Sequence, residues 1–391
     1  MDTSPATTPT PGTSSWLPGR GQRAIQGARR RVWLRACRPL KTKRVNSSLR
    51  SGSDHHTISV VIPNLDGAHW LEGCLRTLTS GDAQPFEVIV ADDGSTDASR
   101  VVSHRFGARF VDAPRPRTGF ATTANRGIRA ATGEWILLLN NDTEVSSTAI
   151  SALTTAMKEH PSVAMIAPLV LSLRDRESID SAGMLIFPDA TARPRWHGEK
   201  ITTKSPRLEE VLVPSGAAAL FRSSWLERVG LLDERMTSYL EDIDLGLRVR
   251  RVGGVALFVP GAVIFHYFSG TTGALSPTKA RFIERNHTTV AARHLPLHWL
   301  LLLPVWTVIR WGVLAKTVLR SRAMPSDDPS PPVHETIVAV LRGLVEGIVR
   351  LPRSLRERRL FRQHATVGAR DWRALLAAHR AHIGDYERFG A

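Results

Sequence analysis

Cysteine is almost absent from this chain of 391 residues, which contains only Cys37 and Cys74. Two cysteines so far apart in sequence indicate neither a disulfide framework nor a zinc site, and they are consistent with a reducing compartment. A secretory signal is also missing, because residues 1–18 are rich in Thr, Ser and Pro and contain no apolar core. We therefore expect a cytoplasmic protein, long enough to bury one large core.

Long apolar runs are missing as well. The uninterrupted apolar segment 299–309 has about 11 residues and contains Pro304, whereas a membrane-spanning helix needs about 20 residues. Tryptophans beside Arg and Lys in residues 295–319, and apolar positions at helical spacing in 337–348, favour amphipathic helices that lie on a membrane. The alternatives are a buried extension of the enzyme domain and a single membrane span.

The net charge of +16 is concentrated at the two ends of the chain. Residues 1–56 have 11 Lys and Arg against 2 Asp and Glu, and residues 310–391 have 15 against 8, whereas residues 57–309 have 26 of each. We expect a disordered basic tail over 1–56, an enzyme domain over 57–294 and a basic helical extension over 295–391. A neutral central region argues against a nucleic-acid-binding protein, so the anionic partner we expect is lipid.

Three short apolar segments, 58–63, 86–91 and 135–139, are each followed by polar side chains. Their spacing predicts βαβ units in a mostly parallel sheet, whose strand ends bring these polar groups to one edge. Asp92 and Asp93 suit the hydroxyls and base of a nucleotide, and Asp142 suits Mg²⁺ or Mn²⁺ carrying a diphosphate. The alternative at each position is a turn or helix-capping residue.

Later segments add groups for catalysis and recognition. Glu241, Asp242 and Asp244 open a predicted helix, and one of these carboxylates is a plausible general base. His266 follows a predicted strand and can supply a nitrogen ligand to a metal. Residues 172–210 are polar and irregular, so we expect a mobile loop over the site.

The ordered motifs VVIPNLDG, VIVADDGSTD, ANRGIRAATGEWILLLNNDTEV, VPSGAAALFR, YLEDIDLGLR, HYFSGTTG and ERN resemble the family 2 glycosyltransferases of GT-A fold. The rhamnosyltransferase-like enzymes of bacterial cell-surface polysaccharide synthesis are the most similar group. The resemblance covers residues 57–295. It implies an α/β fold, and metal-assisted, inverting transfer of a sugar, with rhamnose the first choice, from a nucleotide diphosphate sugar to a glycan or lipid-linked glycan.

The resemblance also implies roles for single residues. Asp242 would be the catalytic base with Glu241 beside it, and Asp142 and His266 would hold the metal. We assign donor binding to Pro63, Asp66, Asp92, Asp93, Asn125, Asn141, Arg281 and Asn286, and acceptor binding to Trp196, Ser215 and Gly216. The metal motif is Asn140-Asn141-Asp142, with a single carboxylate.

The resulting hypothesis is a peripheral or monotopic enzyme at the cytoplasmic face of the cell membrane. A catalytically inactive scaffold of the same fold is the first alternative. A nucleotidyltransferase, the next alternative, would need a phosphate-binding loop rich in glycine and containing a lysine after the first strand. The segment PNLDG at that position contains no lysine and only one glycine. A nucleic-acid-binding protein is the last alternative.

Overall fold

The computed structural model describes residues 57–115, 117–267, 276–321, 332–382 and 384–385. The described residues all fall within one compact unit, Ser47–Ala391. The basic tail predicted over 1–56 lies outside the described residues, as do Ser269 and Gly270 of the HYFSGTTG motif.

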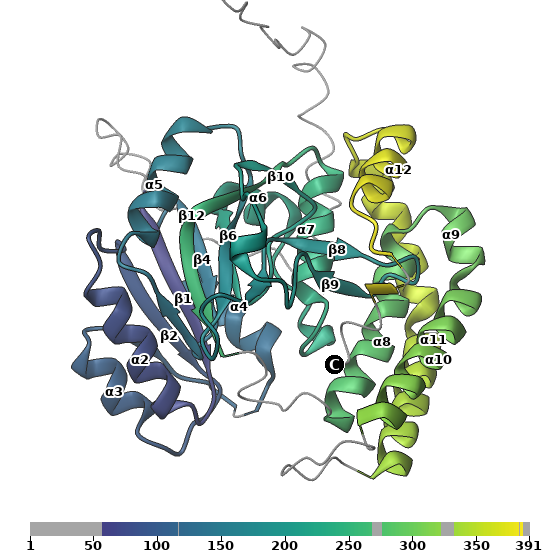
Figure 1. Ribbon diagram of the computed structural model, residues 1–391, viewed down its shortest axis with the longest axis horizontal. Helices are drawn as coiled ribbons and strands as arrows, with labels where there is room; N and C mark the ends of the chain where they lie inside the picture. The colour runs from purple at the N-terminus through teal and green to yellow at the C-terminus, as the bar shows by residue number, and fades with distance from the viewer. Residues whose placement is uncertain (1–56, 116, 268–275, 322–331, 383, 386–391) are drawn as a thin grey trace, which may run out of the picture. The chain divides into compact units, whose positions relative to one another are not determined.

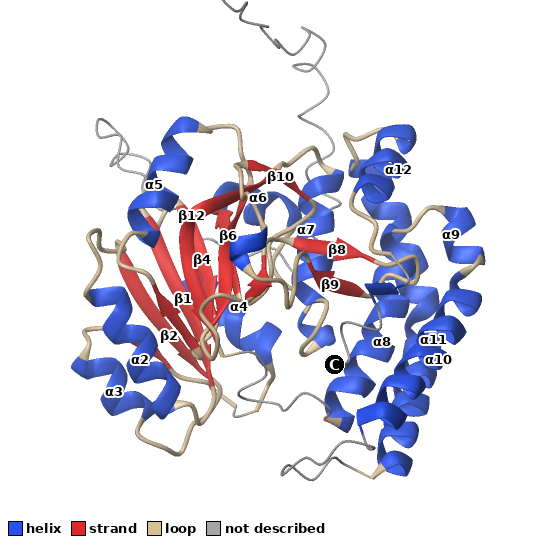
Figure 2. Ribbon diagram, viewed as in Figure 1, coloured by secondary structure: helices blue, strands red, loops and turns tan. Residues whose placement is uncertain are grey.

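A large mixed sheet forms the centre of this unit (Figures 1 and 2). Its strand order is β10-β12-β6-β11-β4-β1-β2-β3, with β5 paired to β12 and β7 paired to β6. The strands are β1 (Ile58–Asn64), β2 (Glu87–Asp92), β3 (Arg109–Val111), β4 (Trp135–Leu139), β5 (Thr143–Val145), β6 (Met165–Ser172), β7 (Ile179–Ser181), β10 (Glu209–Val211), β11 (Ala218–Arg222) and β12 (Ala256–His266).

The predicted α/β fold, with a mostly parallel sheet flanked by helices, is confirmed. Strands β3, β2, β1 and β4 are parallel neighbours, and β6 runs parallel to β12. Within the sheet, β11 is antiparallel to both β4 and β6, and the short strands β5, β7 and β10 also pair antiparallel with their neighbours. Strands β1 and β4 are buried along their whole length, as expected for apolar segments covered on both faces.

Helices cover both faces of the sheet. Side chains of α2 (Ala68–Thr79), α3 (Ser99–Arg105) and α5 (Ala149–Glu159) join alternate residues of β1 and β4 in one apolar core. Helix α4 (Phe120–Ala130) lies on the other face, where Gly127 approaches Val61 so closely that a Cβ would stand 2.4 Å from its side chain. Helices α6 (Ser223–Val229) and α7 (Glu241–Arg251) follow β11.

Residues 172–210 are not an irregular loop throughout, which corrects the prediction from sequence. They contain β7, β8 (Met184–Ile186), β9 (Ala192–Pro194), β10 and a short 3-10 helix, η2 (Ile201–Thr203). Strands β8 and β9 form a small separate hairpin sheet. Each strand has only three residues, too few for the alternating pattern that identifies a strand from sequence.

The C-terminal region is helical, as predicted. It consists of α8 (Pro277–His294), α9 (Leu297–Leu301), α10 (Leu303–Ser321), α11 (Val333–His364) and α12 (Ala369–Ala378). None of the helices in the described ranges is long and apolar enough to cross a membrane. The loop preceding α7 contains the short helix η3 (Glu234–Met236).

Two glycines on one face of α11 set its distance from α8. A Cβ at Gly343 would stand 2.4 Å from the carbonyl oxygen of Arg281, and one at Gly347 would stand 2.8 Å from Oγ1 of Thr288. The four-residue spacing places both glycines on the same side of the helix. Helices α8 and α11 therefore pack backbone against backbone over at least one turn.

This packing predicts opposite effects of the same substitution at two helical glycines. Gly343→Ala should lower the free energy of unfolding by about 1–3 kcal/mol, because the added methyl group overpacks the contact. Gly312→Ala on α10, where a Cβ would meet nothing within 4 Å, should raise it by up to about 1 kcal/mol through helix propensity. Urea unfolding measures both, and equal effects would contradict the close packing.

Candidate active site

The carboxyl ends of β1, β2 and β4 are joined by side-chain hydrogen bonds. Nδ2 of Asn64 donates to Asp92 at 3.2 Å and to Ser99 at 2.9 Å, while Oδ1 of Asn64 accepts from Asn141 at 2.8 Å. All four residues are buried. The predicted donor-binding residues Asp92 and Asn141 are therefore brought together at one sheet edge, and Asn64, which sequence reasoning did not assign, connects them.

Asp92 and Asp93 each organise a loop. Asp92 accepts from the backbone N–H groups of Gly94 (2.9 Å) and Ser95 (2.7 Å). Asp93 accepts from those of Thr118 (2.9 Å) and Gly119 (2.8 Å) and so fixes the loop that leads into α4. The turn-forming alternative is thus part of what these carboxylates do.

The turn that follows β1 contains Asp66, which forms an ion pair with Arg117. Asp66 accepts from the backbone N–H of Thr96 at 2.7 Å and lies 3.2 Å from the guanidinium of Arg117. Both Asp66 and Arg117 have positive φ angles, 47° and 56°. Pro63, also predicted to bind the donor, lies buried in β1 opposite Ala91. Of these two predicted residues only Asp66 is exposed.

Asp142 and His266, 124 positions apart in sequence, lie side by side. Strand β5 pairs antiparallel with β12 and sets His266 opposite Thr143, which leaves Nε2 of His266 3.3 Å from Oδ1 of Asp142. Nδ1 of His266 lies 2.6 Å from Oδ2 of Asp180 on β7. Asp180 was not predicted, because it stands in the polar segment that has no strand pattern.

Two carboxylates determine the protonation of this histidine. Burial alone would lower the pKa of His266, but the carboxylates of Asp142 and Asp180 raise it to about 10. The pKa of Asp180 is lowered to about 2 because, against the effect of burial, it accepts from His197 and His266. With no metal bound, His266 carries a proton at neutral pH.

The same residues fit a divalent cation with a substrate diphosphate. Within the described residues no cluster of three or more His, Cys, Asp and Glu side chains forms a complete metal site. Oδ1 of Asp142 is nevertheless buried and faces Nε2 of His266 at 3.3 Å, so a cation between them would take the place of the imidazole proton. The Asp180 contact through Nδ1 orients Nε2 of His266 toward Asp142, as in carboxylate–histidine–metal arrangements. One carboxylate and one imidazole, completed by phosphate oxygens and water, suit Mg²⁺ or Mn²⁺.

Asp242 is held in place by the small-residue segment predicted to contact the acceptor. Its Oδ2 accepts from the backbone N–H of Gly216 at 2.8 Å, and a Cβ at residue 216 would stand 2.9 Å from that oxygen. Ser215 accepts through its carbonyl from the N–H of Ala218 at 3.1 Å, which shapes the turn. Ala217 accepts from the N–H of Asn140 at 3.0 Å, so this turn joins the base candidate to the Asn140-Asn141-Asp142 motif.

Burial raises the pKa values of both carboxyl groups at the start of α7. For Glu241 the nearby Asp242 adds to the effect of burial, and its pKa lies well above the usual value. For Asp242, burial outweighs the hydrogen bonds from Ile243 and Gly216, and its pKa is also raised. A carboxylate with a raised pKa is a better proton acceptor, which suits a general base.

The loop before α7 has an unusual backbone. Thr237, Tyr239 and Leu240 have φ angles of 64°, 69° and 67°, and such conformations cost about 1–3 kcal/mol each in non-glycine residues. Nδ2 of Asn286 on α8 donates to the carbonyl oxygens of Met236, Ser238 and Tyr239 at 2.7–2.9 Å. Asn286 therefore supports the loop that presents Glu241 and Asp242.

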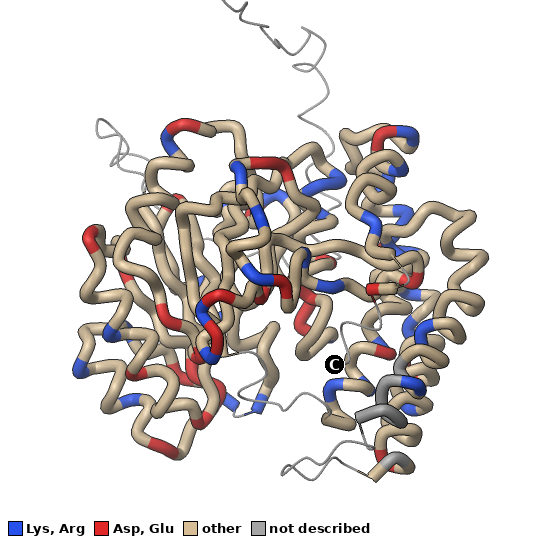
Figure 3. Tube along the Cα trace, viewed as in Figure 1, with Lys and Arg blue, Asp and Glu red and all other residues tan. Residues whose placement is uncertain are grey.

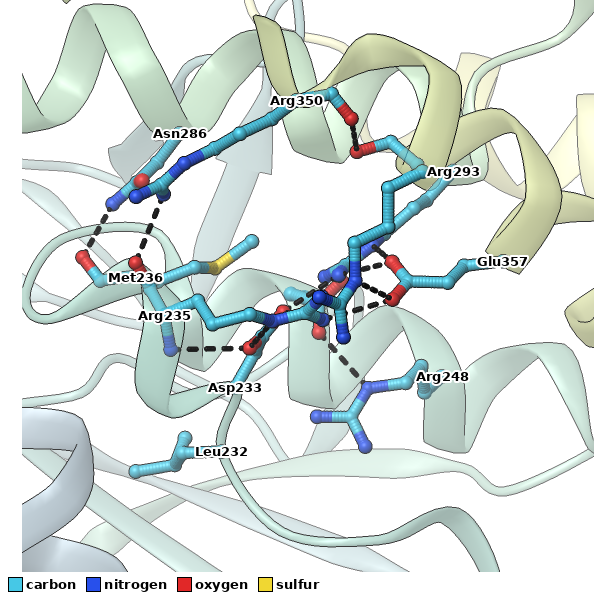
Figure 4. Close-up of polar contacts among 12 residues, drawn as sticks. Leu232, Asp233, Arg235, Met236, Arg248, Asn286, Arg293, Arg350 and Glu357 are labelled. Atoms are coloured by element: carbon cyan, nitrogen blue, oxygen red, sulfur yellow. Dashed lines mark hydrogen bonds and ion pairs between the residues drawn. The ribbon is translucent and has the colours of Figure 1, made fainter. Parts of the chain in front are cut away.

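A buried ion network connects α7 to the C-terminal helices (Figure 4). The guanidinium of Arg293 on α8 lies 2.9 Å from Asp244, 2.6 Å from Asp233 and 2.5 Å from Glu357 of α11. Arg248 pairs with Asp244 at 2.9 Å, and Arg235 pairs with Asp233 and Glu357. Of the three acids at the start of α7, Asp244 is therefore part of the scaffold.

Three other predicted residues have structural partners. Asn125 donates to the carbonyl oxygen of Leu232 at 2.9 Å and accepts from its N–H at 3.0 Å. Arg281 pairs with Glu346 of α11. Trp196 packs edge-on against Phe258, near the start of the strand that His266 ends. The structure does not bring these three side chains to the group around Asp142 and His266.

The chain is similar to known glycosyltransferases. The family model Glycosyl transferase family 2 matches residues 59–230. The chain contains a family 2 glycosyltransferase domain. It is 29% identical over 297 residues to the N-acetylglucosaminyl-diphospho-decaprenol L-rhamnosyltransferase of Mycobacterium tuberculosis, with 68% of this chain and 91% of the relative covered.

Two solved structures are also similar. Residues 1–349 of S. aureus TarS with UDP-GlcNAc give a TM-score of 0.48 at 15% identity, covering 85% of this chain and 90% of that one. The mannosyltransferase PcManGT of Pyrobaculum calidifontis with GDP-Man and Mn²⁺ gives 0.43 at 18% identity, covering 85% and 83%. The match of the family 2 domain ends before α7, so the start of α7 is assigned from geometry.

The support of the loop by Asn286 predicts a local change. Asn286→Ala removes the donor to the carbonyl oxygens of Ser238 and Tyr239, while Met236 keeps its bond from Arg285, so amide hydrogen exchange in residues 236–244 should accelerate at least 10-fold. The midpoint of thermal unfolding should fall, because unsatisfied buried polar groups cost about 1–3 kcal/mol each. Thr278→Ala, at an exposed position of the same helix, is the control. Unchanged exchange in the Asn286 variant would remove this role.

Proposed function

We propose that this chain transfers a sugar, with inversion, from a nucleotide diphosphate sugar to a hydroxyl of a lipid-linked glycan in cell-envelope synthesis. One observation carries the proposal. The Gly216-Ala217 turn joins Asp242, a carboxyl group of raised pKa, to the motif that carries Asp142. Asp142 lies 3.3 Å from His266, so a proton acceptor and a cation-binding pair belong to one connected site.

In this mechanism Asp242 receives the proton of the acceptor hydroxyl. The hydroxyl oxygen attacks the anomeric carbon of the donor sugar, and the bond between that carbon and the diphosphate breaks. The Gly216 N–H holds the carboxylate of Asp242 in one orientation. Burial and the neighbouring Asp242 raise the pKa of Glu241, which favours an uncharged carboxyl group beside the carboxylate of Asp242. A divalent cation held by Asp142 and His266 would offset the negative charge that develops on the leaving diphosphate.

Donor and acceptor are proposed from the relatives. The mycobacterial relative carries an L-rhamnosyltransferase name that includes a diphospho-decaprenol acceptor. We infer dTDP-rhamnose as the first donor to test and a polyprenyl diphosphate-linked sugar as the first acceptor. At the donor edge, Asp66, Asp92, Asp93 and Asn141 are the proposed contacts to the nucleotide sugar.

The donor and the cation are tested together by thermal shift. Wild-type protein should melt higher with dTDP-rhamnose and Mn²⁺ than with either alone, because ligands that bind only the folded state stabilise it. Asp142→Ala should abolish the Mn²⁺-dependent part. Asp180→Asn should weaken Mn²⁺ binding about 10–100-fold, as expected for the loss of a hydrogen-bonded partner behind a ligand. No shift with any nucleotide sugar, in folded protein, would favour the inactive-scaffold alternative.

The base assignment makes a prediction on pH. Turnover should fall as the pH drops through the pKa of Asp242, which lies above the usual 3.8, because the base must be unprotonated. Asp242→Asn should reduce turnover about 10²–10⁴-fold while leaving donor binding nearly unchanged. Asp244→Asn, two residues along the same helix, should instead lower stability, because Asp244 belongs to the buried ion network. Full turnover in the Asp242 variant would exclude it as the base.

We infer that the C-terminal helices dock on the cytoplasmic face of the cell membrane. Apolar side chains are exposed on three of them, including Leu301 (73% exposed) on α9, Val308 (62%) on α10 and Val349 (74%) on α11. Basic residues recur along α11 and α12 (Figure 3). Exposed apolar groups beside positive charge suit an interface with anionic lipid.

Docking is tested by sedimentation with vesicles of phosphatidylcholine and phosphatidylglycerol. Replacing Val308 and Val349 by Ser should lower the bound fraction several-fold, because apolar area no longer leaves water. The control replaces Val101 and Leu208, which are 62% and 45% exposed outside the C-terminal helices. Equal losses in the two double variants would contradict a specific docking face.

A further inference from the structure

A small cavity lies where the end of α8 meets α9, α11 and α12. Its volume is about 210 Å³, below the range of about 300–1,000 Å³ typical of pockets for drug-sized ligands. It therefore suits a small ion or a headgroup. The residues that line it include five arginines and two histidines: Arg251, Arg293, Arg358, Arg362, Arg373, His294 and His298.

One side of this cavity is electrically balanced. Arg293 lies among Asp233, Asp244 and Glu357. His294 contacts Asp244 at 2.9 Å, and burial lowers its pKa, so it is neutral near pH 7. The acids of this network are thus already paired with Arg293, Arg248 and Arg235. They leave no carboxylate for the other arginines of the cavity.

The other side carries positive charge without compensation. In the described part of the chain no ion pair involves Arg251, Arg358, Arg362 or Arg373. Nη1 of Arg251 is buried and has no hydrogen-bond partner. Burial and two neighbouring arginines, Arg362 and Arg251, lower the pKa of Arg358 to about 10. The group still carries its charge at neutral pH, and an anion in the cavity would relieve this repulsion.

Two of these arginines, Arg358 and Arg251, are held in position by their neighbours. Nη1 of Arg358 donates to the carbonyl oxygens of Ala292 and Leu295, at 3.2 and 2.6 Å, at the end of α8. The guanidinium of Arg251 lies 4.8 Å from the centre of the Trp372 ring, and Nε1 of Trp372 donates to the carbonyl oxygen of His294. Guanidinium groups that are held in place in this way, with the exposed Arg362 and Arg373 at the rim of the cavity, match the oxygens of a phosphate group.

We propose that the cavity lined by Arg251, Arg358, Arg362 and Arg373 binds a phosphate group. Neither Asp142 nor Asp242 lines this cavity, so the site is distinct from the candidate active site. The phosphate belongs to an anionic lipid or to a soluble phosphate. The lipid is favoured because Leu297, which lines the cavity, is 61% exposed and opens α9 beside Leu301. Only this choice of lipid rests on the proposed membrane docking.

The test uses the full chain and two double variants of equal charge change. Arg251→Gln with Arg362→Gln alters the cavity, and it leaves Arg358, which supports α8, in place. Arg356→Gln with Arg359→Gln alters two exposed positions of α11 that do not line the cavity. One arm measures the shift in melting temperature with inorganic phosphate at constant ionic strength. The other measures binding to vesicles with and without phosphatidylglycerol.

The proposal expects phosphate to raise the melting temperature of wild type and of the Arg356/Arg359 variant but not of the cavity variant. For a lipid ligand, affinity for phosphatidylglycerol vesicles should fall at least 10-fold in the cavity variant and under 3-fold in the control. A phosphate shift with equal vesicle binding in both variants would assign the site to a soluble phosphate. Equal responses of both variants in both arms would overturn the proposal. Neither arm contains nucleotide sugar, so this result is independent of glycosyl transfer.

Discussion

The buried contact between Arg293 and its three carboxylates connects the catalytic region to the C-terminal helices. Arg293 belongs to α8, Asp244 to α7, Asp233 to the loop before it and Glu357 to α11. Burying one of these charges alone would cost several kcal/mol, so each element is stable only when its partners are in place. The extension is therefore a structural part of the enzyme as well as its proposed contact with the membrane.

The stability that this ion network contributes also depends on pH. The charged partners lower the pKa of Asp233 to about 2 and hold that of Asp244 well below its usual value. Because these folded-state values lie below the usual 3.8, the network contributes its full stability above that pH and loses it as the pH falls toward 2. At neutral pH the fixed network holds α7 in place. On the adjoining loop, Asn286 supports the left-handed residues that lead into Glu241 and Asp242.

The sequence was sufficient for features with a strong local pattern. Apolar segments followed by polar residues such as Asp92 and Asn141 predict the sheet, and the family resemblance predicts that Asp142 and His266 share a site, where the structure places them 3.3 Å apart. Asp180 was missed because β7 has three residues and no periodicity. For Asn286 the sequence predicts a donor contact, and it could not show the three carbonyl oxygens to which this residue donates, because they lie about 50 positions away. Trp196 indicated a sugar contact, but an aromatic ring packs equally well on Phe258, and composition does not separate these cases.

The central claim is a single displacement in which Asp242 activates the acceptor hydroxyl. The most direct test is the anomeric configuration of the product, determined by NMR after transfer from dTDP-rhamnose to a polyprenyl diphosphate-linked N-acetylglucosamine. The account predicts a configuration opposite to that of the donor, formed without a covalent sugar–enzyme intermediate. Retention of configuration would contradict it, because retention requires a different arrangement of catalytic groups.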